Sequence, residues 1–479
     1  MKLQLVSPVP DVGFAFNQGA YWPVGLLTIA SHVKRCVPDL DIELFDEALV
    51  DQHRRTQNTI SGDIVGIQAA SCLTYGSVLR LAEAAKRKGA YVIVGGAFAT
   101  ELGRQILEKR GCIDAVVVGS GEAPMVAIVE TLRQGSGIAG LRGIPGVWSR
   151  CNGGIVGTDS DGPFDYERCR PLDYSLVPVS TYHRNYHLMN PYFDGACQIF
   201  THFGCKYRET RRSAGKEWCT YCSLSDRLVL RTPEDICTEV REALKSANVR
   251  PGARLMLKCY GDNASALCEH LDAIARALAG DPVLVSFDLW WSLYAQSSFI
   301  TPRLVEVLQR LRVWEVYIGF DSGDDGIQRL NSLGTTTASH LRAARLLRDA
   351  GIRIQAGFVL GCAGETKDSM SATVRLAETL AGLGNVDLFH ASPLVVLPGS
   401  PAFRMLCGCV PALRDIDFLN TTQLQHEWIR HFCPQLGEPE SALHLLDRTA
   451  RGLVALGRMT SSFGGWAERD GAPSRVEAR

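Results

Sequence analysis

Three cysteines near the middle of the chain have the spacing of a soft metal centre. Cys205, Cys219 and Cys222 are separated by 13 and then 2 residues, and they follow a predicted strand at 197–200. Thiolates select zinc or an iron–sulfur cluster. A structural zinc site is closed by four ligands, whereas a four-iron cluster on three cysteines leaves one iron open to a substrate or cofactor. The trio favours a cluster, but His202 could complete a Cys3His site, and a zinc-stapled loop stays as an alternative.

The sequence after the trio alternates strand and helix patterns, as is needed to position such a loop. With the strand at 197–200, the expected strands are 254–259, 283–289, 315–319, 353–360 and 387–393. The expected helices are 265–279, 302–311, 338–350 and 367–383. Six strands in this order are too few to close an eight-stranded barrel. The sequence therefore predicts a partial (βα)6 barrel with its chemistry at the carboxyl ends of the strands.

The first part of the chain shows the same alternation. Strands are expected at 2–6, 42–46, 63–68, 91–94 and 115–118, and helices at 24–36, 75–89, 101–110 and 122–133. This order predicts an α/β, doubly wound, flavodoxin-like (Rossmann-type) sheet that binds its ligand beyond the carboxyl ends of the strands. Small residues stand there: Ser71-Cys72-Leu73, Gly95-Gly96 and Gly119-Ser120-Gly121-Glu122. A Gly-x-Gly-x-x-Gly motif is missing after the first strand, which argues against a nicotinamide or flavin dinucleotide.

Residues 196–400 resemble the radical S-adenosylmethionine superfamily. The resemblance rests on the trio with Tyr221 before its last cysteine, Tyr260-Gly261-Asp262, Gly319-Phe320-Asp321-Ser322-Gly323, the run 357–366 and Pro398-Gly399-Ser400-Pro401. It implies that Cys205, Cys219 and Cys222 ligate a [4Fe-4S] cluster. It also implies a set of S-adenosylmethionine contacts: Tyr221, Gly261, Asp262, Asp321, Ser322 and Gly361. The first gap of 13 residues exceeds the usual three and resembles that of some cobalamin-dependent members.

The first domain resembles the cobalamin (B12)-binding domain that precedes many of these enzymes. The matching segments are Tyr21-Trp22-Pro23-Val24-Gly25-Leu26-Leu27, the strand at 63–67 and the small residues named above. The resemblance implies cobalamin contacts from six residues: Ser71, Leu73, Gly95, Gly96, Gly119 and Glu122. The Asp-x-His-x-x-Gly motif is absent from the loop 8–20. The resemblance thus implies a corrin without a protein histidine on its lower face, or a domain that has lost its cofactor.

Together the two resemblances imply a C-methyltransferase acting on an unactivated carbon of a natural-product or peptide substrate through a 5′-deoxyadenosyl radical. One alternative is a radical enzyme that catalyses cyclisation, rearrangement or transfer of another S-adenosylmethionine fragment. An alternative of another class is a non-catalytic metal-binding or electron-transfer module. The implied partners are a small-molecule or peptide substrate and a low-potential electron donor such as flavodoxin or ferredoxin.

Composition limits the remaining possibilities. The 479 residues carry 50 Lys plus Arg against 51 Asp plus Glu, a formal net charge of −1, so no nucleic-acid or acidic-membrane partner is expected. Without an apolar run of about 20 residues or a secretion signal, a cytoplasmic protein is expected. The predicted divisions are a cobalamin-binding-like domain at 1–140, a connector at 141–195, the barrel at 196–400 and a helical region at 401–479. That last region carries Cys407 and Cys409, which are expected to be structural, and a frayed tail after Gly464.

Overall fold

The computed structural model describes residues 1–10, 19–50, 59–151, 153–160, 171–223, 227–419, 421–457, 459–462 and 465–468. Two compact units divide the chain. The first unit comprises residues 1–185, 237–249 and 415–420, and the second comprises 186–236, 250–414 and 421–479.

The first unit is built on a seven-stranded sheet in the order β2-β1-β3-β4-β5-β6-β7. Its strands are β1 (Lys2–Ser7), β2 (Asp41–Asp46), β3 (Ile64–Gln68), β4 (Tyr91–Gly95), β5 (Ala115–Val117), β6 (Val147–Cys151) and β7 (Gly154–Gly157). The first five strands are parallel, which confirms the predicted doubly wound α/β fold. Strands β6 and β7 lie within the expected connector, and they extend the same sheet as an antiparallel hairpin.

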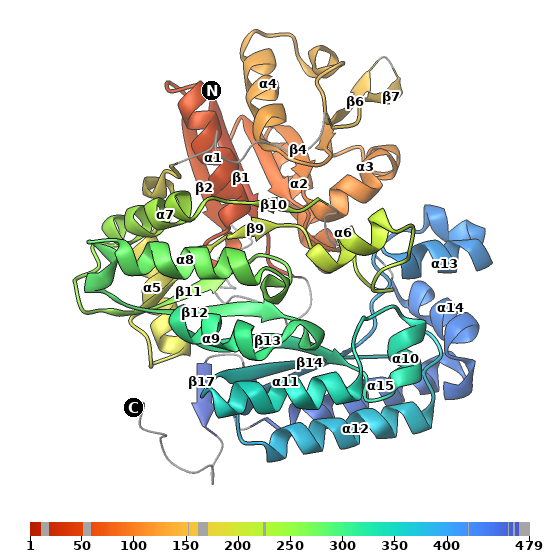
Figure 1. Ribbon diagram of the computed structural model, residues 1–479. Coiled ribbons are helices and arrows are strands. Elements are labelled where there is room, and N and C mark those ends of the chain that lie inside the picture. Colours follow the sequence, from red (N-terminus) through yellow and green to blue (C-terminus); the bar gives the residue numbers. More distant parts are fainter. Residues whose placement is uncertain are drawn as a thin grey trace. The chain divides into compact units, whose positions relative to one another are not determined.

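Four helices cover this sheet: α1 (Val24–Cys36), α2 (Tyr75–Arg87), α3 (Ala97–Lys109) and α4 (Glu122–Arg133) (Figure 1). Leu26 and Val33 of α1 and Ile128 of α4 pack with Leu5 of β1 and Ile93 of β4 in one buried core. Helices α1 and α4 therefore share a face of the sheet. Runs of buried residues such as those of β3 and β4 are expected when a parallel sheet is covered on both faces.

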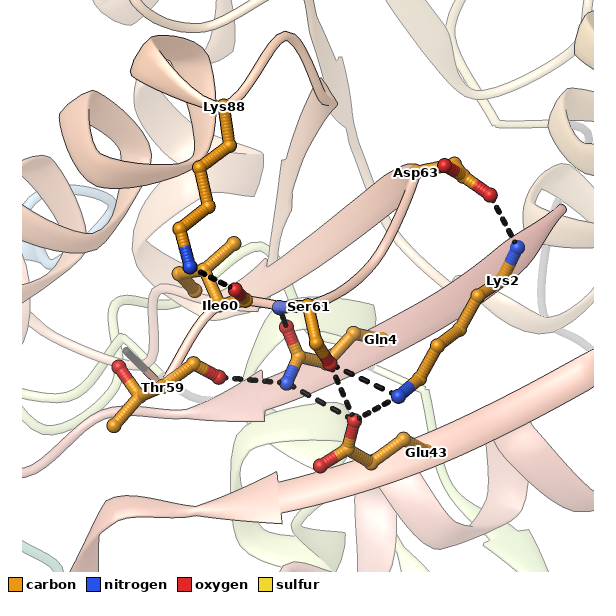
Figure 2. A network of polar contacts seen from close by, with 8 residues as sticks. All are labelled: Lys2, Gln4, Glu43, Thr59, Ile60, Ser61, Asp63 and Lys88. Atoms are coloured by element: carbon orange, nitrogen blue, oxygen red, sulfur yellow. Dashed lines mark hydrogen bonds and ion pairs between the residues drawn. The ribbon is translucent and has the colours of Figure 1, made fainter. Parts of the chain in front are cut away.

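A polar network fixes the amino-terminal ends of the first strands. Figure 2 shows that Glu43 of β2 accepts hydrogen bonds or an ion pair from Lys2, Gln4 and Ser61. Gln4 is fully buried, and its amide also joins Thr59 and the Ser61 backbone at 2.8 and 3.0 Å. Because the ligand edge of such a sheet is the opposite, carboxyl end, this network sets strand register and takes no part in ligand binding.

A short segment from late in the chain belongs to the first unit. In residues 415–420, the ring of Phe418 lies 5.4 Å from the ring of Phe98 on α3, edge to face. Asp417 forms an ion pair of 2.5 Å with Arg110, just after α3. The first unit is therefore discontinuous in sequence.

The second unit contains a six-stranded parallel sheet in the order β15-β14-β13-β12-β11-β8. Its strands are β8 (Gly195–Ile199), β11 (Arg254–Cys259), β12 (Asp288–Ala295), β13 (Val313–Asp321), β14 (Arg353–Leu360) and β15 (Val386–Pro393). Along one face lie α8 (Cys268–Gly280), α9 (Pro302–Arg310), α11 (Thr337–Asp349) and α12 (Lys367–Gly382) (Figure 1). The six strands and their sequential order were both predicted.

One strand was predicted in the wrong place. The third strand of this sheet was expected at 283–289, but β12 starts at Asp288 and continues to Ala295. The Asp281 carboxylate accepts hydrogen bonds from the backbone N–H groups of Val283 and Leu284, which closes a 3-10 turn where the strand was expected. The shift matters because it puts Ser292 and Tyr294 into the sheet.

The rest of the second unit is mostly helical, as expected. It contains β9 (His202–Phe203), α6 (Lys206–Ser213), β10 (Val229–Leu230), α10 (Asp325–Leu330), α13 (Pro401–Cys409), α14 (Thr422–Phe432) and α15 (Pro439–Val454). The tail expected to fray after Gly464 instead begins with β17 (Gly465–Glu468), which pairs antiparallel with β16 (Met459–Ser462) because a hairpin satisfies its backbone groups. Residues 469–479 lie outside the described residues. Two of the sequence boundaries between the units fall within α5 (Val179–Met189) and α7 (Pro233–Ser246).

Candidate functional site

The first cysteine of the trio begins a helix just beyond the carboxyl end of β8. Cys205 is the N-cap of α6, although its side chain makes no capping hydrogen bond. The backbone N–H groups of Tyr207 and Arg208 and the side chain of Asn263 lower the pKa of its thiol. These donors favour a thiolate. Burial has the larger, opposite effect and raises the pKa of the Cys205 thiol, so without a metal the sulfur stays protonated.

The three thiols of the trio interact with one another. Burial raises the pKa of Cys219 well above its ordinary value, and the charges of Cys222, Asp321 and Cys205 raise it further. Within the described ranges, no three His, Cys, Asp or Glu side chains are close enough together to hold a single ion. A four-iron cube spreads its sulfur ligands over three corners and so needs wider spacing than one ion does. Three thiols are the donor set that a four-iron cluster with one open iron requires.

His202 does not extend this donor set. Its Nδ1 lies 2.8 Å from the Thr201 hydroxyl, and its Nε2 lies 2.8 Å from the Asp262 carbonyl oxygen. Burial lowers the pKa of His202 to about 4, so the ring is neutral. Because both ring nitrogens are already engaged, His202 serves to hold the 260–262 loop, and the Cys3His alternative loses its fourth ligand.

Asn331, which the sequence analysis missed, fixes the Cys-x-x-Cys loop. The carbonyl oxygen of this fully buried residue accepts from the backbone N–H and the hydroxyl of Thr220, both at 3.1 Å. Its side chain exchanges two hydrogen bonds with the Ala363 backbone, at 2.9 and 3.1 Å. The Ala402 N–H at the start of α13 then donates to the Thr220 carbonyl at 2.7 Å. Three segments distant in sequence thus hold the loop between Cys219 and Cys222.

The predicted contacts Gly261 and Asp262 lie on the loop after β11. A Cβ on Gly261 would overlap the ring of His202, so only glycine allows this close approach. Burial raises the pKa of Asp262 to about 6, while the Gly204 N–H and the charge of Arg208 act in the opposite direction. The Asp262 carboxylate therefore stands beside the loop that carries Cys205.

Asp321 and Tyr221 meet across the site. The Tyr221 hydroxyl donates a hydrogen bond to the Asp321 carboxylate, and burial raises the pKa of Asp321 to about 6. Asp321 has a φ of 59°, at a register shift between β13 and β14. A left-handed backbone is unfavourable for a residue with a Cβ and is typical of functional positions. These two predicted contacts are brought together beside Cys219.

Ser322 and Gly361 are turned toward protein partners. The Ser322 hydroxyl accepts from the Asp324 N–H at 3.2 Å. The Gly361 N–H donates to Glu365 at 3.2 Å, and its carbonyl oxygen accepts from Trp428 Nε1 at 2.8 Å. Both residues shape the loops around the site, and their contact with S-adenosylmethionine stays a prediction.

Two arginine side chains pack against the ring of Trp218, which lies in the segment between the first two cysteines. The Arg208 guanidinium lies 4.3 Å from the centre of the Trp218 ring, and that of Arg404 lies 5.2 Å from it. Arg404 also pairs with Glu217 at 3.1 Å. The tryptophan thus orders the insert through cation–π contacts.

In the first unit, the small residues at the strand ends are tightly packed. The Ser71 hydroxyl accepts from the Leu73 N–H at 3.3 Å and caps a short 3-10 turn. The Gly95 carbonyl accepts from the Ala69 N–H at 2.7 Å. Gly96 has a φ of 111°, and a Cβ there would lie 2.7 Å from the Ala69 carbonyl oxygen. These residues close the turns after β3 and β4.

A cavity of about 350 Å³ opens beyond β5. It is lined by Gly119, Thr100, Arg104 and Trp148 among others. Gly119, with a φ of 76°, donates its N–H to the Thr100 hydroxyl at 3.0 Å, and a Cβ there would lie 3.1 Å from the Cβ of Ser160. Of the six predicted cobalamin contacts, only Gly119 lines this cavity. The cavity lies at the carboxyl edge of the sheet, where folds of this kind bind their ligands.

Glu122 is the other distinctive residue of this edge. It is 5% exposed, and its Oε2 is buried without a hydrogen-bond partner among the described residues. Burial raises the pKa of Glu122 to about 7.

Two histidines follow the loop 8–20 in the sequence. His32 of α1 lies with its Nε2 3.8 Å from the Cys36 sulfur, and His53 is outside the described residues. No helix in the described segments is long and apolar enough to cross a membrane.

Models of two known families match two successive parts of the chain. The model of the B12-binding domain matches residues 18–129, and that of the radical SAM superfamily matches residues 203–377. An uncharacterised methyltransferase of Pyrococcus horikoshii is 22% identical over 391 residues, 79% of this chain and 78% of the relative. The anaerobic magnesium-protoporphyrin IX monomethyl ester cyclase of Rubrivivax gelatinosus is 24% identical over 424 residues, 85% and 70% of the two chains.

Solved structures share the fold over most of the chain. The radical S-adenosylmethionine methyltransferase TsrM from Kitasatospora setae, with tryptophan and an S-adenosylmethionine analogue bound, has a TM-score of 0.63 at 19% identity. The match covers 85% of this chain and 76% of that one. The cobalamin-dependent S-adenosylmethionine radical enzyme OxsB has a TM-score of 0.64 at 13% identity, covering 87% and 62%. At these identities the likeness concerns the fold.

Proposed function

The chain is a radical S-adenosylmethionine enzyme with a B12-binding domain, and from this premise we propose that it is a C-methyltransferase acting on an unactivated carbon of a small-molecule or peptide substrate. The observation that carries the proposal is the coupled thiol trio beside the Tyr221–Asp321 pair, in one chain with a B12-binding sheet. Its cofactors are a [4Fe-4S] cluster, S-adenosylmethionine and cobalamin. When bound, they supply a 5′-deoxyadenosyl radical and a transferable methyl group.

The residues of the second unit hold and orient these groups. Cys205, Cys219 and Cys222 ligate the cluster and leave one iron open. The Asp262 carboxylate meets the methionine amino group, since a buried anion beside the cluster favours an ammonium partner. Asp321 accepts hydrogen bonds from the ribose hydroxyls, in the position where it now accepts the Tyr221 hydroxyl.

The residues of the first unit hold the cobalamin. Gly119 leaves its cavity open to the nucleotide tail, and the tight turns at Ser71 and Gly96 bring backbone close to the ligand edge. Glu122 contributes a carboxyl that is half protonated near neutral pH and can donate or accept.

Anaerobic reconstitution with cobalamin and methyl-labelled S-adenosylmethionine tests the proposal. We expect 5′-deoxyadenosine and S-adenosylhomocysteine together, with iron and sulfide in the protein. Cys219→Ala abolishes both products and the cluster absorption, because a two-cysteine site cannot retain the cube. Cys268→Ala on α8 is the matched control, since Cys268 lies outside the trio, and it retains both. Zinc in place of iron, or cleavage retained in Cys219→Ala, refutes the ligand assignment.

A second candidate is radical cyclisation without methyl transfer. It is favoured by the similarity to a relative named as a cyclase. The same reaction separates the two: 5′-deoxyadenosine without S-adenosylhomocysteine supports cyclisation, whereas stoichiometric S-adenosylhomocysteine and labelled product support methylation.

A further inference from the structure

The face of the second sheet opposite its outer helices carries two layers of side chains that have no role in the proposed binding of the cluster, S-adenosylmethionine or cobalamin. Side chains two residues apart in a strand share a face of the sheet. Ser292 and Tyr294 of β12 and Glu315 and Tyr317 of β13 are two such pairs, and Lys258 of β11 with Tyr260, the residue after that strand, continues the pattern. In each pair the first member is polar and the second is a tyrosine. The pattern continues upward to Asp262 and Asp321 of the site.

The lower layer is a buried chain of hydrogen bonds. The Lys258 ammonium donates to the Ser292 hydroxyl at 2.8 Å, and that hydroxyl donates to the Glu315 carboxylate at 3.0 Å. Gln355 of β14 donates to the same carboxylate oxygen at 2.7 Å. Arg353, the other cation near Glu315, is paired with Asp387. Glu315 therefore balances Lys258, but through an intervening hydroxyl.

This arrangement leaves Lys258 able to bind a ligand. An ammonium has three N–H groups, and one of them is used by Ser292. The Tyr294 ring centre lies 5.4 Å from Nζ, which stabilises the charge without blocking its remaining donors. Lys258 forms no ion pair with any residue in the described part of the chain. A buried ammonium held in this way is a binding group for an anion.

The upper layer is aromatic and partly accessible. The ring centres of Tyr260 and Tyr294 lie 6.5 Å apart, those of Tyr294 and Tyr317 lie 5.4 Å apart, and those of Tyr317 and His390 of β15 lie 5.6 Å apart. All four residues are half-buried, in contrast to the buried layer beneath. A Cβ on Gly357 would overlap the Tyr317 hydroxyl, so the glycine makes room for this ring. A planar group can stack here.

His390 provides a second polar group at the same place. Its Nε2 is buried and has no hydrogen-bond partner among the described residues. Burial and then the charge of Lys258 lower the pKa of His390 to about 4, so the ring is neutral and adds no charge. A neutral imidazole N–H within electrostatic range of the Lys258 ammonium can share with it the two oxygens of a carboxylate.

We propose that this aromatic floor binds a substrate that joins a planar ring to a carboxylate, with the carboxylate on Lys258 and His390 and the ring among the tyrosines. The single cation, already balanced in part by Glu315, suits a monoanion better than a phosphate dianion. Asp262 lies two residues beyond Tyr260 and Asp321 lies four residues beyond Tyr317, steps of about 7 and about 13 Å for extended chain, so the floor adjoins the side of the cofactor site that carries Asp262. The proposal rests on the proposed function and deepens it by naming the substrate class.

Binding to the full-length, anaerobically reconstituted enzyme tests the floor without turnover. The probes are indole-3-acetate, phenylacetate and 2-naphthylacetate, each paired with its amide, measured by titration calorimetry. We expect at least one acid to bind about tenfold or more tightly than its amide. Lys258→Met then reduces acid binding to the level of the amide, and Lys258→Arg restores part of the preference. Lys367→Met, an exposed lysine of α12, leaves the preference unchanged.

The outcomes separate the two proposals. Iron content and S-adenosylmethionine binding are measured on every variant, and their retention in Lys258→Met shows that the site is intact. Equal binding of every acid and its amide, or an acid preference that survives Lys258→Met, overturns the floor. Neither result bears on methyl transfer, which is decided separately by whether the reconstituted enzyme forms S-adenosylhomocysteine and labelled product.

Discussion

Replacing Asn331 by alanine tests whether the Cys-x-x-Cys loop is held from outside. The substitution removes three side-chain hydrogen bonds, two to the Ala363 backbone and one to the Ile327 carbonyl oxygen at 2.9 Å. At about 1 kcal/mol for each buried bond, the loss is about 3 kcal/mol. The backbone carbonyl that binds Thr220 is retained in this variant, so the lost bonds act by loosening the segment that carries that carbonyl, and the expected effect is easier local opening of the cluster site.

The assay is the rate at which an anaerobic iron chelator bleaches the cluster absorption. A loss of about 3 kcal/mol in the closed loop corresponds to bleaching that is faster by up to about 100-fold. Asn385→Ala is the matched control, because Asn385 donates to the backbone oxygens of Ala344 and Ile352 at 3.2 and 3.3 Å, just before β15. We expect it to lower overall stability and leave the bleaching rate near that of the wild type. Equal bleaching in Asn331→Ala and the wild type would refute the reasoning.

Three further predictions concern the loops and the cobalamin edge. Gly261→Ala forces a Cβ into the ring of His202, and we expect it to weaken S-adenosylmethionine binding about tenfold or more, measured by equilibrium dialysis. The control Gly280→Ala has open space around its new Cβ and leaves this affinity unchanged. Gly119→Leu fills the cavity beyond β5, and we expect it to abolish cobalamin uptake, measured by absorption spectroscopy. The control Gly135→Leu carries the same positive-φ strain in open space and retains uptake. Equal uptake by both variants would contradict the cavity assignment. Burial raises the pKa of Glu122 to about 7, above its value of roughly 4.3 in the unfolded chain. The folded state therefore holds the proton more tightly, and the free energy of unfolding falls as the pH rises from the lower pKa to the higher one. Glu122→Gln removes that loss, about 3 kcal/mol by about pH 8, and an unfolding difference from the wild type that stays constant between about pH 5 and about pH 8 argues against it.

Local sequence patterns were sufficient for most of the fold. Short runs of β-branched and apolar residues between helical patterns predicted the five parallel strands of the first unit and five of the six in the second. The cysteine spacing predicted a metal-binding loop after β8. The one misplaced strand shows the limit of this reasoning. Val283 and Val285 look like strand residues, but the Asp281 cap turns them into an exposed 3-10 turn.

The missing parts of the site depend on contacts between distant segments. Asn331 follows a short helix and carries no motif of its own, and its role appears only when Thr220 and Ala363 are placed on either side of it. The aromatic floor was missed for a related reason. Tyr294 was not assigned to any strand, so its alignment with Tyr317 and Tyr260 was invisible in the sequence.

The discontinuity of the first unit governs how the protein can be dissected. A fragment that ends at residue 185 lacks Phe418 and Asp417, leaving the Phe98 ring uncovered and Arg110 without its counter-ion. Such a fragment would expose apolar surface and tend to aggregate for reasons unrelated to cobalamin. A substitution near residue 418 is therefore expected to reduce the amount of cobalamin that the protein retains, although more than three hundred residues separate this position from α3 in the sequence.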